Sequence, residues 1–163
     1  MLTHSELKIF KQNVIFLVEK NYQVTYAAAK AIGCDRGDFS KLLYREKNFR
    51  LETLIKIAKT FNVSVFLLFS RLFDDPQYRD SFPFVDADYM SIIRTNFHAQ
   101  SIPQSHIALD STTVSHIMNG RRSNVTIRTI CKIAAGASMS ISELLKTEED
   151  KIREKQLKEE ENE

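Results

Sequence analysis

Apolar residues recur at helical spacing along most of the chain. Leu7, Phe10, Val14 and Leu17 follow one another at steps of three or four positions, which predicts a helix over residues 5–21. The same spacing predicts further helical segments that begin near Thr25, Asp35, Leu51, Ser64, Tyr89, Pro103, Asp110, Ile127 and Ile141. The chain has only 4 Gly and 3 Pro, which favours helices over a turn-rich sandwich or barrel. We therefore expect an all-α fold.

A stretch rich in turn signals divides the chain into two parts. Asp74-Asp75-Pro76 and Ser81-Phe82-Pro83 fall within it, and each proline disfavours helix at the residue before it. This predicts a first unit over 1–73, a linker over 74–85, a second unit over 86–147 and a charged tail over 148–163.

The two units match as an internal repeat. Residues 35–42 align with residues 110–117 at an offset of 75, and residues 54–58 align with residues 130–134 at an offset of 76. Apolar positions agree while charges vary. We interpret this as two copies of one small helical unit, each with its own core. Chance agreement between two amphipathic helices is the alternative.

Charge is distributed unevenly along the chain. The net charge is +2, but residues 148–163 hold eight acidic and four basic residues, so the remainder carries +6. A basic body suggests a polyanionic partner. We expect the tail to be a solvated helical extension that frays into disorder.

Several segments resemble the DNA-binding domain of Cro/CI-type (XRE family) helix-turn-helix regulators. Ala28–Asp35 is similar to the second helix and tight turn of that family, and Arg36–Tyr44 to its recognition helix. Val114–Arg122 closely matches the recognition helix and the basic loop after it. Residues 54–65 and 130–145 are similar to the fourth and fifth helices.

This resemblance implies two tandem five-helix lambda-repressor-like helix-turn-helix units that bind double-stranded DNA. It further implies a transcriptional regulator of bacterial or phage origin, with repression the commoner mode. A homodimer and a cytoplasmic, nucleoid-associated location follow as expectations.

The chain also departs from the family pattern. Gly37 lies inside the first recognition helix, where a glycine costs up to about 1 kcal/mol. Seven positions rather than eleven separate Ala108 from Ser115, so about one helical turn is missing from the second unit. We expect a shortened second helix or an altered turn there.

The first unit offers candidate DNA contacts on the outward face of its recognition helix and beside it. Arg36 and Lys41 can donate to guanine O6 and N7, and Gly37 would permit a close approach. Lys47 and Arg50 would lie along phosphates, which gives affinity rather than sequence choice. The first-unit candidates are Thr25, Arg36, Gly37, Ser40, Lys41, Lys47 and Arg50. Plain solvation is the alternative for the charged ones.

The second unit offers hydroxyl groups where the first offers charges. Hydroxyls can contact bases or phosphates, and a threonine methyl can meet a thymine methyl. Helix capping is the alternative role for Ser111 and Thr112. The second-unit candidates are Ser111, Thr112, Thr113, Ser115, His116, Arg121 and Arg122.

Other chemistry is sparse. The four histidines are scattered without metal-ligand spacing, and there is no Gly-rich phosphate loop or nucleophile motif, so we expect no metal, no cofactor and no enzyme. Cys34 and Cys131 suggest reduced thiols, and no apolar run is long enough for a membrane span.

Two alternative functions remain open. One is a helical protein-interaction module, and the other is an antitoxin-like autorepressor that binds another protein. The segment Val63–Phe73 has eight apolar residues, more than one face of a helix can bury, so we expect it to pack on the second unit or on a protein partner.

Overall fold

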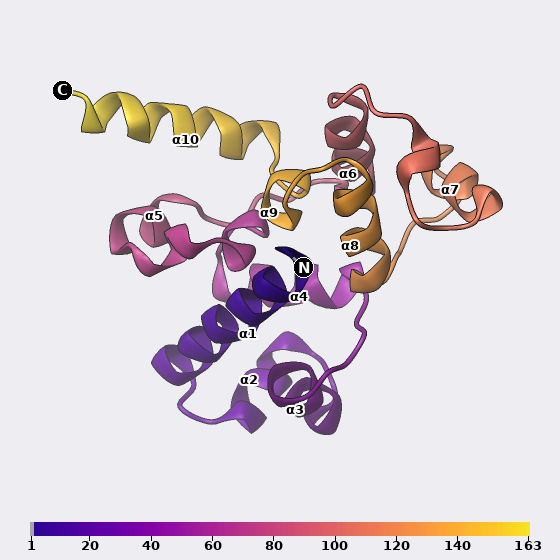
Figure 1. The fold of residues 1–163 in the computed structure, drawn as a ribbon. Coiled ribbons are helices and arrows are strands. Elements are labelled where there is room, and N and C mark those ends of the chain that lie inside the picture. Colours follow the sequence, from indigo (N-terminus) through magenta and orange to yellow (C-terminus); the bar gives the residue numbers. More distant parts are fainter. Residues whose placement is uncertain (1) are drawn as a thin grey trace.

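The computed structural model describes residues 2–163, with side chains from Ser5 onward, and the described chain is all-α (Figure 1). The elements of the first half are α1 (Leu2–Asn21), α2 (Thr25–Ile32), α3 (Arg36–Tyr44), α4 (Leu51–Phe61), the 3₁₀ helices η1 (Phe66–Phe69) and η2 (Arg71–Asp74), and α5 (Pro76–Ser81). Those of the second half are α6 (Tyr89–His98), the 3₁₀ helix η3 (Gln104–His106), α7 (Ser111–Met118), α8 (Ile127–Gly136), α9 (Ile141–Leu144) and α10 (Glu148–Glu161).

Aspartates cap both α3 and α7. A carboxylate oxygen of Asp35 accepts a hydrogen bond from the Asp38 amide at 3.0 Å, and Asp110 accepts one from the Thr113 amide at 3.0 Å. Each carboxylate satisfies one of the free N–H groups in the first turn of its helix. The chain enters α3 from Gly33, which ends α2 with a φ of 85° that favours glycine.

The apolar segment 64–73 forms two 3₁₀ turns instead of the expected single helix. Ser70 adopts an extended conformation between them, and its hydroxyl accepts a hydrogen bond from the Leu72 amide at 3.1 Å. The side chains of Val63 to Phe69 are all buried, and η1 lies between α1 and α9. The segment therefore packs inside the chain, against the first helix and against the second half.

The expected linker is wrong for residues 76–82, because they fold and pack. Asp75 caps α5 through the Gln77 amide at 2.9 Å, and Pro76 occupies the first helical position, which needs no N–H donor. Tyr78 and Phe82 are buried, and their rings stack with centroids 5.9 Å apart. Two aromatic side chains thus attach this stretch to the core.

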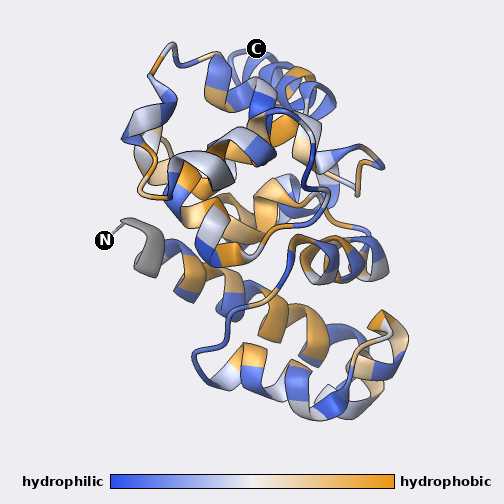
Figure 2. Ribbon diagram, turned by 90° about the vertical axis from the view of Figure 1, so that its right-hand side faces the viewer, coloured by the Kyte–Doolittle hydropathy of each residue, from blue (hydrophilic) through white to orange (hydrophobic). Residues whose placement is uncertain are grey.

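The expectation of a separate core in each half is also wrong. The buried apolar side chains form one cluster that runs from Phe10 in α1 to Leu157 in α10. Figure 2 shows the apolar faces of the helices turned toward this common interior. Burial of the large side chains of η1 requires both halves, so the two repeats stabilise each other.

The charged tail is a helix through Glu161 instead of a fraying extension. Thr147 and Asp150 form a reciprocal capping box, and the Ser64 hydroxyl donates to the buried Asp150 carboxylate at 2.7 Å. The ammonium group of Lys146 lies 2.8 Å from Glu154. These bonds fix the start of α10 on the core, while the rest of the helix points away from α3 and α7 (Figure 1).

The spacing predicts a shortened second helix or an altered turn in the second half. Only the three-residue η3 stands before α7, where the first half has the eight-residue α2. Gly136 permits η3 to lie close to α8, since a Cβ there would lie 3.0 Å from both the His106 carbonyl oxygen and the Ile107 Cα. The missing turn is thus compensated by close backbone packing.

Two buried asparagines give the sequence repeat a counterpart in the structure. The amide of Asn13 donates to the carbonyls of Leu68 and Ser70, at 3.0 and 3.3 Å. The amide of Asn96 donates to the carbonyls of Leu144 and Lys146, at 2.8 and 2.9 Å. Leu68 and Leu144 are separated by 76 residues, as are Ser70 and Lys146, so the ends of η1 and α9 are fixed in the same way.

Candidate nucleic-acid interface

The helix α3 divides cleanly into a buried and an outward face. Phe39, Leu42 and Leu43 are buried against the core. The sequence-predicted residues lie on the other face, where Arg36, Gly37 and Lys41 are exposed and Ser40 is half-buried. The outward face therefore presents two cations, a hydroxyl and a bare backbone position to solvent.

Tyr26 orients the guanidinium group of Arg36. The guanidinium carbon lies 5.3 Å from the centre of the Tyr26 ring, and this ring is 56% exposed at the start of α2. A guanidinium stacked on an aromatic face keeps its N–H donors free for other partners. Helical spacing does not point to Tyr26, because its contact with Arg36 depends on how α2 and α3 pack against each other.

Lys47 is paired with an acidic residue that the sequence interpretation left out. Its ammonium group forms an ion pair with the Asp38 carboxylate on the first turn of α3. This hydrogen bond and the nearby positive charge lower the pKa of the Asp38 carboxyl below its usual range. A phosphate would have to compete with Asp38 for Lys47.

Two further candidates of the first half lie at helix starts. Thr25 is the first residue of α2 and is half-buried, and Val24 before it provides no side-chain cap. The first N–H groups of α2 therefore have no side-chain acceptor, and this arrangement suits a phosphate oxygen. Arg50 is exposed directly before α4.

The outward face of α7 carries hydroxyls. Ser111, Thr112 and Ser115 are exposed, while Thr113 and His116 are half-buried. The Ser115 hydroxyl accepts a hydrogen bond from the Asn119 side chain at 3.1 Å and can still donate its own proton. The hydrogen bonds from Thr113 lower the pKa of the Asp110 carboxyl, so this cap is ionised at neutral pH.

Arg121 and Arg122 follow α7 after a turn. Gly120 has a φ of 76° there, and both arginines are exposed. Neither forms an ion pair with any residue of the part of the chain that the structure describes. Their charge is available to a partner.

The predicted residues thus form two sets, one around α3 and one around α7. These two helices lie at separate edges of the molecule, and the acidic helix α10 extends on the side away from both (Figure 1). The fold consequently separates the basic surfaces from the negative charge of the tail.

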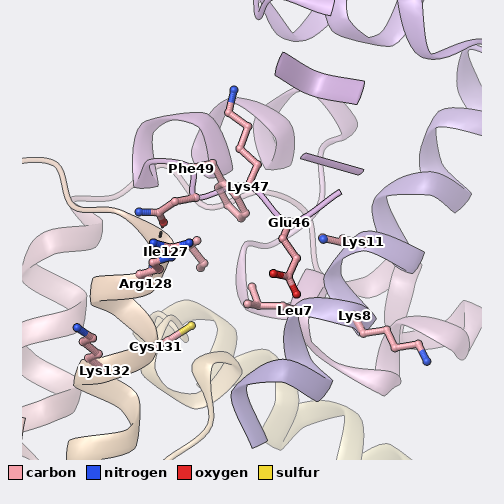
Figure 3. A pocket seen from close by; sticks show the side chains of 11 residues that line it. Leu7, Lys8, Lys11, Glu46, Lys47, Phe49, Ile127, Arg128, Cys131 and Lys132 are labelled. Carbon is pink, nitrogen blue, oxygen red and sulfur yellow. Dashed lines mark hydrogen bonds between the residues drawn. The ribbon is translucent and has the colours of Figure 1, made fainter. Parts of the chain in front are cut away.

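A groove of about 480 Å³ lies where the two halves meet, between α1, the loop after α3 and α8 (Figure 3). Its floor is apolar, with Leu7, Phe49 and Ile127 among the lining residues. Its rim carries one acidic residue and five basic ones, which are Lys8, Lys11, Lys47, Arg128 and Lys132. The groove extends the positive surface from Lys47 toward the second half.

The same groove contains the half-buried Cys131. Burial and the charge of Glu6 raise the pKa of its thiol to about 11, so the thiol is protonated at neutral pH. Among the residues that the structure describes, no group of three or more His, Cys, Asp or Glu side chains could hold a metal ion. Within the same range, no helix has the length and apolar character to cross a membrane.

No protein-family model, curated protein or solved structure matches the chain.

Proposed function

We propose that the protein is a sequence-specific DNA-binding transcriptional regulator. The observation that carries the proposal is the repeated, Asp-capped helix with an outward polar face, α3 in the first half and α7 in the second. In the first half this helix follows α2 after three residues that include Gly33, which is the layout of a helix-turn-helix.

The two outward faces are suited to reading base edges. Arg36 and Lys41 supply donors for the guanine O6 and N7 acceptors of the major groove. Thr112 and Ser115 supply hydroxyls that both donate and accept, and the Thr112 methyl suits the thymine methyl. Buried apolar residues hold each helix rigidly, so these side chains are presented on a fixed framework.

The surrounding basic residues are suited to the phosphate backbone. Arg50, Arg121 and Arg122 are exposed, and the groove beside Lys47 adds further positive charge. Contacts of this kind provide salt-dependent affinity without sequence choice. The placement of the acidic α10 on the far side keeps its repulsion away from the DNA.

Selection from random duplex DNA tests this function. The full-length protein is expected to recover a common sequence at low salt. Lys41→Ala is expected to weaken binding to the recovered sequence at least about tenfold, as expected for a lost base contact. Lys155→Ala is the matched control, because it removes the same charge from the exposed face of α10.

Failure to retain any duplex at low salt would refute the proposal. Equal effects of Lys41→Ala and Lys155→Ala would refute base reading by α3. If the protein retains no DNA but captures a protein through the α3 or α7 surface, the interaction module is the correct function.

A further inference from the structure

The two halves meet at a junction whose hydrogen bonds are reciprocal. The amide of Leu51 donates to the carbonyl of Val125 at 2.7 Å, and the amide of Ile127 donates to the carbonyl of Phe49 at 2.7 Å. Residues 51 and 127 are equivalent in the repeat, as are residues 49 and 125, because each pair is separated by 76 positions. If each residue is replaced by its equivalent in the other half, each of these two hydrogen bonds therefore becomes the other one.

Two side chains beside these backbone hydrogen bonds are also related by the repeat. Asn48 accepts a hydrogen bond from the Arg128 amide at 3.2 Å, and Asn124 accepts one from the Glu52 amide at 3.1 Å. Asn48 and Asn124 are again separated by 76 residues, as are their two donors. In each case an asparagine of one half caps the first turn of the helix α4 or α8 in the other half.

Equivalent elements also meet elsewhere in the molecule. The helices η1 and α9 occupy equivalent places in the repeat and pack directly against each other. The Ser142 hydroxyl of α9 donates to the Phe66 carbonyl of η1 at 3.1 Å, and these two residues are also separated by 76 positions. Equivalent elements thus meet at two places, where residues 48–52 contact residues 124–128 and where η1 packs on α9. These two contacts define an approximate twofold axis inside one chain.

The outward helices α3 and α7 occupy equivalent places in the repeat, at an offset of 75 residues. In Figure 1, α3 lies at the lower edge of the molecule and α7 at its right-hand edge. A twofold pair of outward helices is the arrangement by which two-part DNA sites are read, with half-sites about one helical turn, roughly 34 Å, apart.

We propose that one chain binds as a monomer to an inverted pair of DNA half-sites, with α3 on one half-site and α7 on the other. This inference rests on the proposed function and replaces the homodimer expected from the sequence. The surface on which a second copy would complete the twofold axis is already occupied, since η1 is buried against α9 of the same chain.

The inverted repeat is expected to be imperfect. The equivalent positions differ in chemistry, because Arg36 corresponds to Ser111 and Lys41 to His116. The α3 half-site should contain the guanines that arginine and lysine prefer. The α7 half-site should differ from it at those base pairs.

The junction asparagines act as positioning residues for the half-site distance. Asn48 and Asn124 each accept a hydrogen bond from a backbone amide of the other half, and the Asn124 amide group also donates to the Glu52 carboxylate at 3.5 Å. They therefore act on DNA through the relative placement of α3 and α7. Insertion of five base pairs between the half-sites turns one of them by about half a helical turn. A rigid junction cannot follow that rotation, so we expect at least about a tenfold loss of affinity.

The test uses the full-length protein and the duplex recovered by selection. Native mass spectrometry is expected to find one chain on each duplex. Footprinting is expected to show that both half-sites are protected. Lys41→Ala should weaken protection of one half-site only, and Thr112→Ala that of the other. The five-base-pair insertion should leave protection of a single half-site.

The outcomes separate the two proposals. Two chains on each duplex, or undiminished affinity after the insertion, would overturn the monomer while leaving DNA binding intact. Asn48→Ala combined with Asn124→Ala should restore part of the binding to the inserted duplex, and unchanged spacing preference in that variant would overturn the positioning role. Absence of any DNA binding at low salt would refute the proposed function itself.

Discussion

Asn96→Ala should lower the stability of the whole molecule. The Asn96 side chain is 4% exposed and joins three parts of the chain. Its amide donates to the carbonyls of Leu144 and Lys146, at 2.8 and 2.9 Å, and its oxygen accepts from the Lys151 ammonium group at 2.9 Å. Alanine removes all of these bonds and leaves the carbonyl groups of Leu144 and Lys146 without this donor in a buried region.

The magnitude follows from the bonds that are lost. Two amide–carbonyl hydrogen bonds contribute about 0.5–1.5 kcal/mol each, and a buried group without a partner adds about 1 kcal/mol or more. We expect the free energy of unfolding to fall by about 2–4 kcal/mol. For a chain of this size that corresponds to a decrease of roughly 5–15 °C in the melting temperature.

Urea denaturation followed by circular dichroism measures this loss, with scanning calorimetry for the melting temperature. Thr95→Ala is the control, because Thr95 is exposed on the same helix and should change stability by less than about 0.5 kcal/mol. Asn13→Ala, at the equivalent place in the first half, should lower the same single transition. Two separate transitions, with each variant shifting only one, would show that the halves fold independently and that the common core is not a cooperative unit.

Three more substitutions probe the candidate interface. Asp38→Asn should raise DNA affinity by roughly three- to tenfold in a low-salt titration, because it frees Lys47 and removes a negative charge beside α3; a loss of affinity would mean that the ion pair is needed to shape the interface. Arg36→Ala should reduce the binding free energy by about 1–3 kcal/mol on the preferred duplex and by less on random DNA, whereas Arg121→Ala should weaken binding to both duplexes alike. Fluorescence anisotropy with the two duplexes distinguishes these patterns. The reverse pattern would show that Arg121 reads bases and that Arg36 contacts phosphate. Asp110→Ala should lower the free energy of unfolding by about 1 kcal/mol through loss of the α7 cap, and no change in urea denaturation would show that the cap is dispensable.

Local signals in the sequence were sufficient to predict most helices. The caps at Asp35 and Asp110 and the end of α2 at Gly33 depend on only a few neighbouring residues. A shorter segment before α7 is also visible in the sequence, because the missing turn appears as a difference in spacing.

Long-range packing could not be predicted in the same way. Pro76 and Pro83 predict a linker, but Tyr78 and Phe82 are buried, and the Phe82 ring packs on Phe66 of η1 with ring centroids 5.1 Å apart. The polar composition of residues 148–163 predicts a solvated tail. Its attachment depends on long-range bonds, such as those of Asp150 with the Ser64 hydroxyl and of Lys151 with the Asn96 side chain, which join residues 86 and 55 positions apart.

The candidate site could be predicted only in part, because some of its contacts lie within one helix and others join different elements. Apolar spacing alone separates the outward residues of α3 from the buried ones. The ion pair of Lys47 with Asp38 and the stacking of Arg36 on Tyr26 join residues from neighbouring elements. Such pairs depend on how a turn and a loop direct the chain, which the periodicity of single helices does not specify.

The salt dependence of duplex binding tests the central claim most directly. Arg50, Arg121 and Arg122 are exposed and form no ion pairs within the described chain, so at least three phosphates can be neutralised. At about 0.9 counterions released for each phosphate, the logarithm of the binding constant should fall against the logarithm of salt concentration with a slope of about −2.7 or steeper. A binding constant independent of salt, or no binding at the lowest salt concentration, would contradict DNA recognition by this protein.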